Sequence, residues 1–93
     1  MAFRKDPDAV LDYKWDWSEW LATESDTIAT SQFLPVDGLT FGTGGQSPTH
    51  DSTTATVWLS GGTAGTSYEV TNRITTTGGR TDDRTARIDV SPM

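Results

Sequence analysis

Residues 12–21, DYKWDWSEWL, contain three of the four tryptophans of the chain. Alternate side chains of a strand lie on opposite faces, so Tyr13, Trp15 and Trp17 share one face and the charged residues between them share the other. This pattern predicts a strand that buries an aromatic face in a protein core. The alternation ends after Trp17, where Ser18 is a candidate N-cap for a short helical turn.

Downstream of Ile28 the sequence reads as short strands separated by turn residues. Such a series of alternating segments with frequent turns is typical of a β-sandwich. Residues 42–52 contain three glycines and a proline, and we expect them to be the most mobile loop. Residues 77–80 include a Gly-Gly pair suited to a hairpin turn. The expected strands are 28–34, 39–41, 53–60, 67–76 and 84–90.

The sequence therefore predicts an all-β fold, a small immunoglobulin-like β-sandwich of about seven short strands. The sandwich domain is assigned to residues 12–93 and an extended N-terminal arm to residues 1–11. Tyr68 leaves two interpretations open. It lies three residues after Gly65, where an immunoglobulin-like domain has its tyrosine corner, and it is also the first inward residue of its strand.

The composition is sparse in aliphatic residues for a folded domain. Leu, Ile, Val and Phe number 16 of 93 residues, and the net charge is −6. A low content of these residues together with a high net charge is typical of intrinsically disordered chains. Four tryptophans and two tyrosines offset this, because each aromatic side chain buries on the order of 150–250 Å². We expect one small domain of marginal stability.

Several function classes find no support in the residues. The chain has no cysteine, so disulfides and thiol chemistry are excluded, and its one histidine, His50, lies in a polar segment that suits a solvated loop better than a catalytic or zinc site. We predict no catalytic, cofactor-binding or metal-binding residue. The N-terminus lacks the apolar run of a signal peptide and no segment reaches membrane-span length, so export by a signal peptide and a membrane partner are not expected.

The charges argue against a nucleic-acid partner. Residues up to Asp26 hold seven carboxylates against three basic residues, a net charge of −4, which repels phosphate. The later arginines are interpreted as solvated strand residues near acidic neighbours. The arginines in question are Arg73, Arg80, Arg84 and Arg87, near Asp82, Asp83 and Asp89.

Asp12, Asp16 and Glu19 lie near aromatic rings, as the paired carboxylates of glycosidases do. A small sandwich offers no cleft for a substrate, so these residues are interpreted as the solvent-exposed face of the first strand.

Two blocks of the sequence resemble a known family, the small virion proteins called phage fibre-tail adaptor proteins. The first block has the spacing D-P-x-A-x-x-D-Y-x-x-D-W-x-x-W-L, and the second runs from about residue 60 to 85. The middle, residues 31–53, is unmatched in detail. The matching residues of the first block are Asp6, Pro7, Ala9, Asp12, Tyr13, Asp16, Trp17, Trp20 and Leu21.

The resemblance implies a non-enzymatic structural protein of the phage tail or neck, assembled in the host cytoplasm. It implies partners among other tail or neck proteins and tail-fibre proteins, with multiple copies around the tail axis, and no nucleic acid, membrane, cofactor or small-molecule substrate. In this interpretation the arm orders against a neighbour and exposed aromatic residues anchor the contacts. The predicted partner-binding residues are Phe3, Arg4, Val10, Leu11, Trp20, Leu21 and Trp58.

Two alternatives remain at this point. The first is another place in the virion, as a head-to-tail connector or a capsid decoration protein. The second is a carbohydrate-binding module, which would need two or three coplanar aromatic rings on one exposed face.

Overall fold

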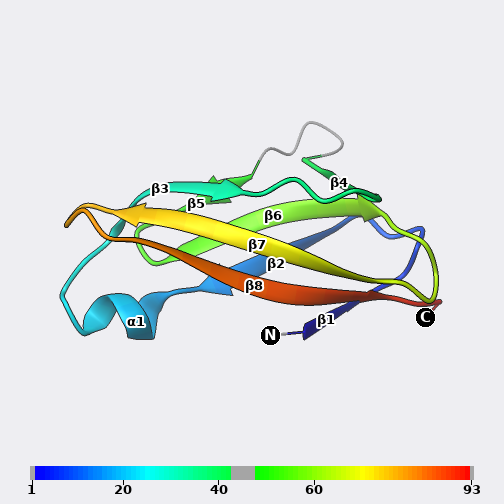
Figure 1. Cartoon of the computed structure of the whole chain (residues 1–93), viewed down its shortest axis with the longest axis horizontal. Coiled ribbons are helices and arrows are strands. Elements are labelled where there is room, and N and C mark those ends of the chain that lie inside the picture. The colour runs from blue at the N-terminus through cyan, green and yellow to red at the C-terminus, as the bar shows by residue number, and fades with distance from the viewer. Residues whose placement is uncertain (1, 43–47, 93) are drawn as a thin grey trace.

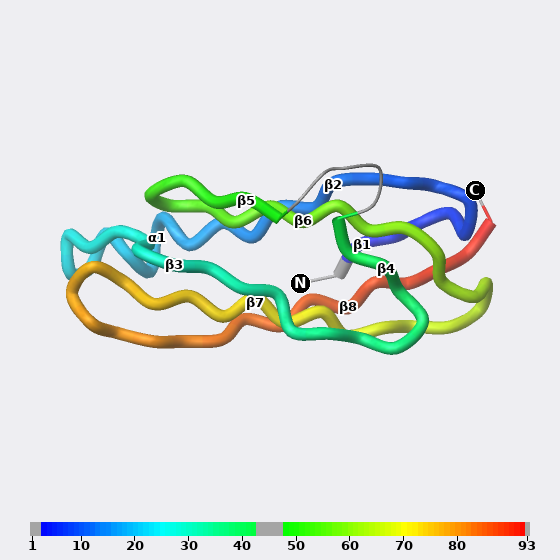
Figure 2. Tube along the Cα trace, turned by 90° about the horizontal axis from the view of Figure 1, so that it is seen from above, coloured from blue at the N-terminus to red at the C-terminus, as the bar shows by residue number. Residues whose placement is uncertain are grey.

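The computed structural model describes residues 2–42 and 48–92 of the chain. These residues form eight strands and one short helix, and the strands make two sheets packed face to face (Figures 1 and 2). The predicted all-β sandwich is confirmed. The elements are β1 (Ala2–Lys5), β2 (Leu11–Asp16), α1 (Ser18–Ala22), β3 (Ile28–Phe33), β4 (Leu39–Phe41), β5 (Thr49–His50), β6 (Thr54–Gly61), β7 (Ser67–Thr76) and β8 (Thr81–Val90).

The first sheet has the strand order β1-β8-β7-β3. Its centre is the long antiparallel hairpin of β7 and β8, whose register runs from the Ser67–Asp89 pair to the Thr75–Thr81 pair. β3 joins β7 in antiparallel orientation, and β1 joins β8 in parallel. The predicted hairpin turn is confirmed, because residues 77–80, which include the Gly-Gly pair, connect β7 to β8.

The second sheet has the order β2-β6-β4, with β5 also paired to β6. β2 lies antiparallel to β6, and Tyr13 and Trp15 face Val57 and Ala55. Figure 2 shows this sheet above the β7–β8 hairpin, with α1 at one end of the sandwich. β2 is paired on one side only, so it forms an edge of this sheet.

The core is built around the aromatic face of β2. Tyr13, Trp15 and Trp17 are 8%, 0% and 0% exposed, which confirms the predicted inward face. Phe33 of β3 packs edge-on against Trp15, with ring centroids 5.1 Å apart. The other buried apolar residues of the core are Leu21, Ile28, Leu39, Val57, Leu59, Val70, Ile74, Ala86, Ile88 and Val90.

One polar side chain links β7, β3 and the residue that follows β2 inside this core. Asn72 of β7 is fully buried; its Oδ1 accepts a hydrogen bond from Trp17 Nε1 at 2.9 Å. Its Nδ2 donates to Ser31 Oγ at 2.9 Å and to the Gln32 carbonyl oxygen at 3.0 Å, both on β3. The amide is thus satisfied on both sides, as burial of a polar group requires.

Residues 2–5, which the sequence analysis assigns to the N-terminal arm, form β1 of the first sheet. The structure corrects three local expectations. Thr49 and His50, expected in a loop, form β5 because β6 offers them an antiparallel edge. β8 begins three residues before the predicted start at Arg84, since pairing with β7 extends the strand through polar residues. Ser18 is the first residue of α1 rather than its N-cap, and its N–H donates to Asp16 Oδ1 at 2.9 Å.

The two interpretations of Tyr68 both hold: its side chain is partly buried and packs inward against the core, and Tyr68 also forms the tyrosine corner. Its Oη accepts a hydrogen bond from the N–H of Thr63, five residues upstream, at 2.9 Å, which is the bond that defines this motif. The expected mobile loop at 42–52 falls partly on residues 43–47, which lie outside the described residues.

Gly38 packs against the ring of Tyr68 and supplies a first prediction. Its φ is +95°, and an added Cβ would lie 2.7 Å from Tyr68 Cε1. Gly65→Ala is the matched control, because its φ of +83° is similar but no atom lies within 4 Å of the added Cβ. We expect Gly38→Ala to lower the free energy of unfolding by about 1–3 kcal/mol more than Gly65→Ala, the typical cost of overpacking. Urea denaturation of both variants tests this, and equal losses would contradict it.

Candidate partner-binding surfaces

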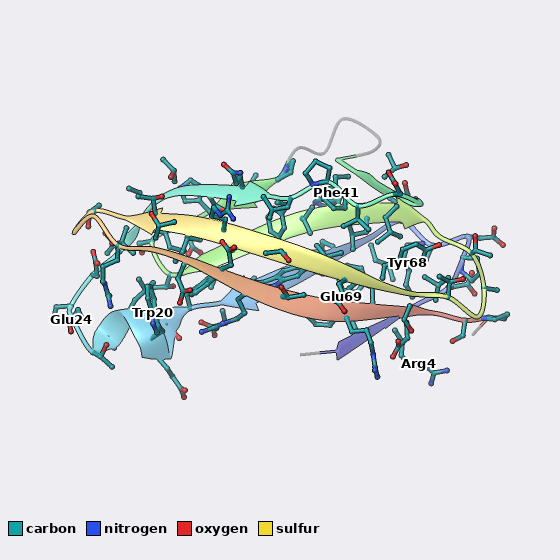
Figure 3. The ribbon with its side chains drawn as sticks, viewed as in Figure 1. Arg4, Trp20, Glu24, Phe41, Tyr68 and Glu69 are labelled. Carbon is teal, nitrogen blue, oxygen red and sulfur yellow. The ribbon has the colours of Figure 1, made fainter. Side chains whose placement is uncertain are left out.

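One end of the sandwich presents a tryptophan flanked by arginines. α1 places Trp20 beside the buried Trp17, with ring centroids 5.4 Å apart at an interplanar angle of 65°, and Figure 3 shows Trp20 on this helix. The Arg80 Cζ lies 4.2 Å from the centroid of Trp20, and the Arg84 Cζ lies 4.2 Å from that of Trp17. Because a cation is attracted to a ring face within about 6 Å, these two stacks fasten α1 and its N-cap residue Trp17 to the β7–β8 hairpin.

A surface hollow of about 570 Å³ opens beside this stack, lined by Asp16, Ser18, Glu19, Trp20 and Arg84. Arg84 Nη1 donates to the Asp16 carbonyl oxygen at 2.7 Å. Hydrogen bonds from the hydroxyl and the N–H of Ser18 lower the pKa of Asp16, which keeps its carboxylate ionised. The half-buried Trp20 ring therefore stands beside acidic groups and suits a protein contact that combines apolar and polar interactions.

Asp26 holds Arg80 in place. Hydrogen bonds to its carboxylate, from the Thr76 hydroxyl first and then from backbone N–H groups, lower the pKa of Asp26 well below its usual range. The carboxylate thereby ties the segment after α1 to the β7–β8 turn. The other donors to this carboxylate are Thr27 N at 2.9 Å, Thr77 Oγ1 and Gly78 N at 3.0 Å, and Arg80 Nε at 3.3 Å.

The opposite end of the molecule presents apolar side chains. Val10 and Leu11, at the start of β2, are 47% and 42% exposed. Arg4 is also exposed at this side of the sandwich (Figure 3), and its Nη2 donates to Ser91 Oγ at 3.3 Å. The structure thus brings Arg4, Val10 and Leu11 to the end that lies away from Trp20.

The N-terminal segment docks on its own domain. Phe3 is half-buried, with its ring 5.0 Å from that of Tyr13 and 5.7 Å from that of Trp15. Lys5 is fully buried, and its Nζ donates to the Gly61 carbonyl oxygen at 2.6 Å. Burial lowers the pKa of Lys5, against the opposing effect of nearby carboxylates. A reach of this segment to a neighbouring protein stays a prediction.

The two remaining predicted contact residues differ in availability. Leu21 is 1% exposed and packs in the core, so its side chain does not reach the surface of the folded chain. Trp58 lies between the buried Val57 and Leu59 and therefore points from β6 to the outer face of the second sheet, where it is partly exposed.

The arginines divide into two groups that sequence analysis did not separate. Arg73 pairs with Asp83 at 2.7 Å and Arg87 with Asp89 at 3.1 Å, on exposed strand faces as expected. The expectation was wrong for Arg80 and Arg84, which stack on tryptophans. The sequence did contain a sign that Arg84 points inward, because Arg84 alternates in step with the buried Ala86 and Ile88 of the same strand. Arg80 lies in the turn between β7 and β8, where no alternation indicates the direction of a side chain.

The residues described by the structure offer no metal site. Within ranges 2–42 and 48–92, no three His, Asp or Glu side chains are placed to hold a metal ion. His50 is exposed on β5. The single helix in these ranges is too short to cross a membrane.

The chain matches the model of a known protein family. A family model described as "Podophage GP4 fiber-tail adaptor protein gp77" matches residues 5–89. No curated protein matches the chain. The matched range includes the hollow beside Trp20 and the exposed Val10 and Leu11.

Proposed function

The chain belongs to the podophage fibre-tail adaptor family, and we propose that it is a non-enzymatic virion protein that joins a tail fibre to the tail through contacts at its two ends. The supporting observation is the separation of its two candidate surfaces. The molecule measures 41 × 25 × 19 Å. Figure 1 shows α1, the helix that carries Trp20, at one end of the molecule, whereas β2, which begins at Leu11, starts toward the other end.

An adaptor must hold two partners at the same time without their blocking one another. A rigid sandwich between two contact surfaces meets this need, since the core fixes the distance between them. We propose that the surface around Trp20 binds one of the two partners and the surface around Val10 and Leu11 binds the other. We also propose that several copies act in each virion, with assembly in the host cytoplasm.

The N-terminal segment adds a conditional contact. An arm over residues 1–11 that reaches a neighbour would require β1 to leave β8 and Lys5 to leave its buried site. Such a reach is therefore proposed only as a rearrangement on assembly, with the neighbour replacing the contacts that β1 makes in the free chain.

A reconstitution assay tests the adaptor function and the role of Trp20. Particles lacking this protein are mixed with purified fibres and the adaptor, and attached fibres are counted by electron microscopy. We expect Trp20→Ala to weaken attachment by about tenfold or more, because tryptophans at contact surfaces are enriched among the residues that dominate binding energy. Far-UV circular dichroism of the variant should remain that of a folded β protein.

Two further variants complete this test. Phe41→Ala, which also removes a partly buried aromatic side chain, is the control and should attach fibres normally. Val10→Glu should abolish binding at the other end, so that the two end variants lose different partners in pairwise binding assays. Normal attachment by both end variants, or unfolding of Trp20→Ala, would contradict the assignment of these surfaces. Cryo-electron microscopy of the virion separates a tail position from a neck or capsid position.

A further inference from the structure

β2 presents an unpaired backbone edge. The N–H of Trp17, which follows β2, donates to the Thr53 carbonyl oxygen at 2.9 Å in continuation of the β2–β6 register. Hydrogen-bonded and non-hydrogen-bonded residues alternate along an antiparallel pair. The backbone groups of Tyr13 and Trp15 therefore point toward β6, and those of Asp12 and Lys14 point away from it, to the free edge.

The other sheet edges are less suited to pairing. β4 and β5 have three and two residues. β3 is interrupted by a register shift between Ile28 and Thr30. β1 is short, and its Arg4 carbonyl oxygen already accepts a hydrogen bond from Tyr13 Oη at 3.1 Å. Among the edges within the described residues, β2 is thus the longest regular one, and regular open edges attract further strands.

The side chains on this edge carry alternating charge. Asp12 and Lys14 are both exposed, and neither makes a side-chain hydrogen bond or ion pair within residues 2–42 and 48–92. The next residue on this face, Asp16, is different, since Arg84 already binds its carbonyl oxygen. The free part of the edge is therefore a short segment centred on Tyr13.

We propose that β2 pairs in antiparallel orientation with β2 of a second copy of this chain, around a two-fold axis beside Tyr13. This register sets Asp12 of each copy opposite Lys14 of the other. Each of these two pairs exchanges two backbone hydrogen bonds and joins opposite charges across the strands, an arrangement that stabilises a sheet. The second sheets of the two copies then form one continuous sheet.

Charge selects this register over its neighbours. A shift that centres the axis on Lys14 sets Lys14 opposite itself and Asp12 opposite Asp16. A shift that centres it on Asp12 sets two aspartates opposite each other. Like charges directly opposite are destabilising. A shift by an odd number of residues would set a residue whose backbone groups point to the free edge opposite one whose groups point to β6, so these backbone groups could not pair. The interface is isologous and closes as a dimer, and its short ladder makes it weak and dependent on concentration.

The proposal does not rest on the adaptor function, because the groups that carry it are the backbone and charges of Asp12 and Lys14, and the variants that test it leave Trp20, Val10 and Leu11 unchanged. Sedimentation equilibrium and light scattering of the isolated chain up to about 1 mM test it. We expect a dimer at high concentration that weakens in 0.5 M salt, since exposed charge pairs are screened at about that concentration. A wild-type chain that stays monomeric throughout overturns the proposal and leaves the edge to an extended segment of a different protein.

A charge-swap experiment tests the register. Lys14→Glu alone and Asp12→Lys alone each place like charges opposite one another, so each should weaken dimerisation by about tenfold or more. In an equimolar mixture the two variants restore opposite charges in both pairs, and the heterodimer should form as strongly as the wild-type dimer. Both side chains are exposed and outside the core, so the fold should be unaffected. Single variants that dimerise normally, or a mixture that does not recover, overturn the register.

Two more variants test the backbone pairing directly. Lys14→Pro removes an N–H that points to the free edge and leaves the β2–β6 hydrogen bonds intact, a position where a strand tolerates proline. It should be folded and monomeric. The chain has no cysteine, so a mixture of Asp12→Cys and Lys14→Cys chains should form a mixed disulfide on oxidation, as the Cα separation of about 5.5 Å in such a pair allows. Dimerisation of Lys14→Pro or absence of the mixed disulfide contradicts the proposal.

Discussion

Trp17→Ala is expected to lower the free energy of unfolding by about 3–5 kcal/mol, the usual cost of truncating a large buried aromatic residue. Trp17 is fully buried between β2 and α1. Its removal also takes the donor from Asn72 Oδ1, and an unsatisfied buried acceptor costs about 1–3 kcal/mol more. A domain of this size has a total stability of about 5–15 kcal/mol, so a large fraction of the variant should be unfolded under mild denaturing conditions.

Urea denaturation followed by far-UV circular dichroism measures this effect without depending on the lost tryptophan. Trp58→Ala is the matched control, since it makes the same substitution at a partly exposed tryptophan on the outer face of β6. It should lose less than half as much stability as Trp17→Ala. Equal losses would mean that the aromatic face of β2 does not dominate the core.

Acid should destabilise the protein through Asp26. The pKa of Asp26 is lowered in the folded state by hydrogen bonds from the Thr76 hydroxyl and from backbone N–H groups. In the unfolded chain the carboxyl has an ordinary pKa of about 3.9. A lowered folded pKa gives stability that is present above the unfolded pKa and is lost as the pH falls below about 4 toward the folded pKa. We therefore expect the urea midpoint to fall steeply between about pH 4 and pH 2.

Asp26→Asn is the variant that isolates this contribution. It should be less stable than the wild type at pH 7 and should lose less further stability below pH 4, because its side chain has no proton to gain. Asp37→Asn is the control, since Asp37 is exposed and its variant should keep the acid dependence of the wild type. An unchanged acid profile in Asp26→Asn would show that other carboxylates cause the acid sensitivity.

The candidate contact surfaces could be predicted only in part. Trp20 was expected at the surface because the strand period ends before it, and it is partly exposed. The arginine above its ring and the carboxylate that orients this arginine come from the distant β7–β8 turn and from the segment after α1. Leu21 follows Trp20 directly and was predicted as a contact, yet the turn of the helix directs it into the core.

The sequence by itself determined six of the eight strands described by the structure, with small shifts of their bounds, and the inward face of β2. β7 was predicted at its observed bounds and the aromatic face of β2 was predicted correctly, because period-two alternation is a local property of neighbouring residues. The family also follows from local spacing in the two matching blocks. Only the tertiary structure decided which strands pair and which charges are buried. Lys5 is buried because it meets a carbonyl oxygen 56 residues away, and β1 exists because β8 offers it an edge. Such contacts depend on the whole chain being folded, and no local pattern encodes them.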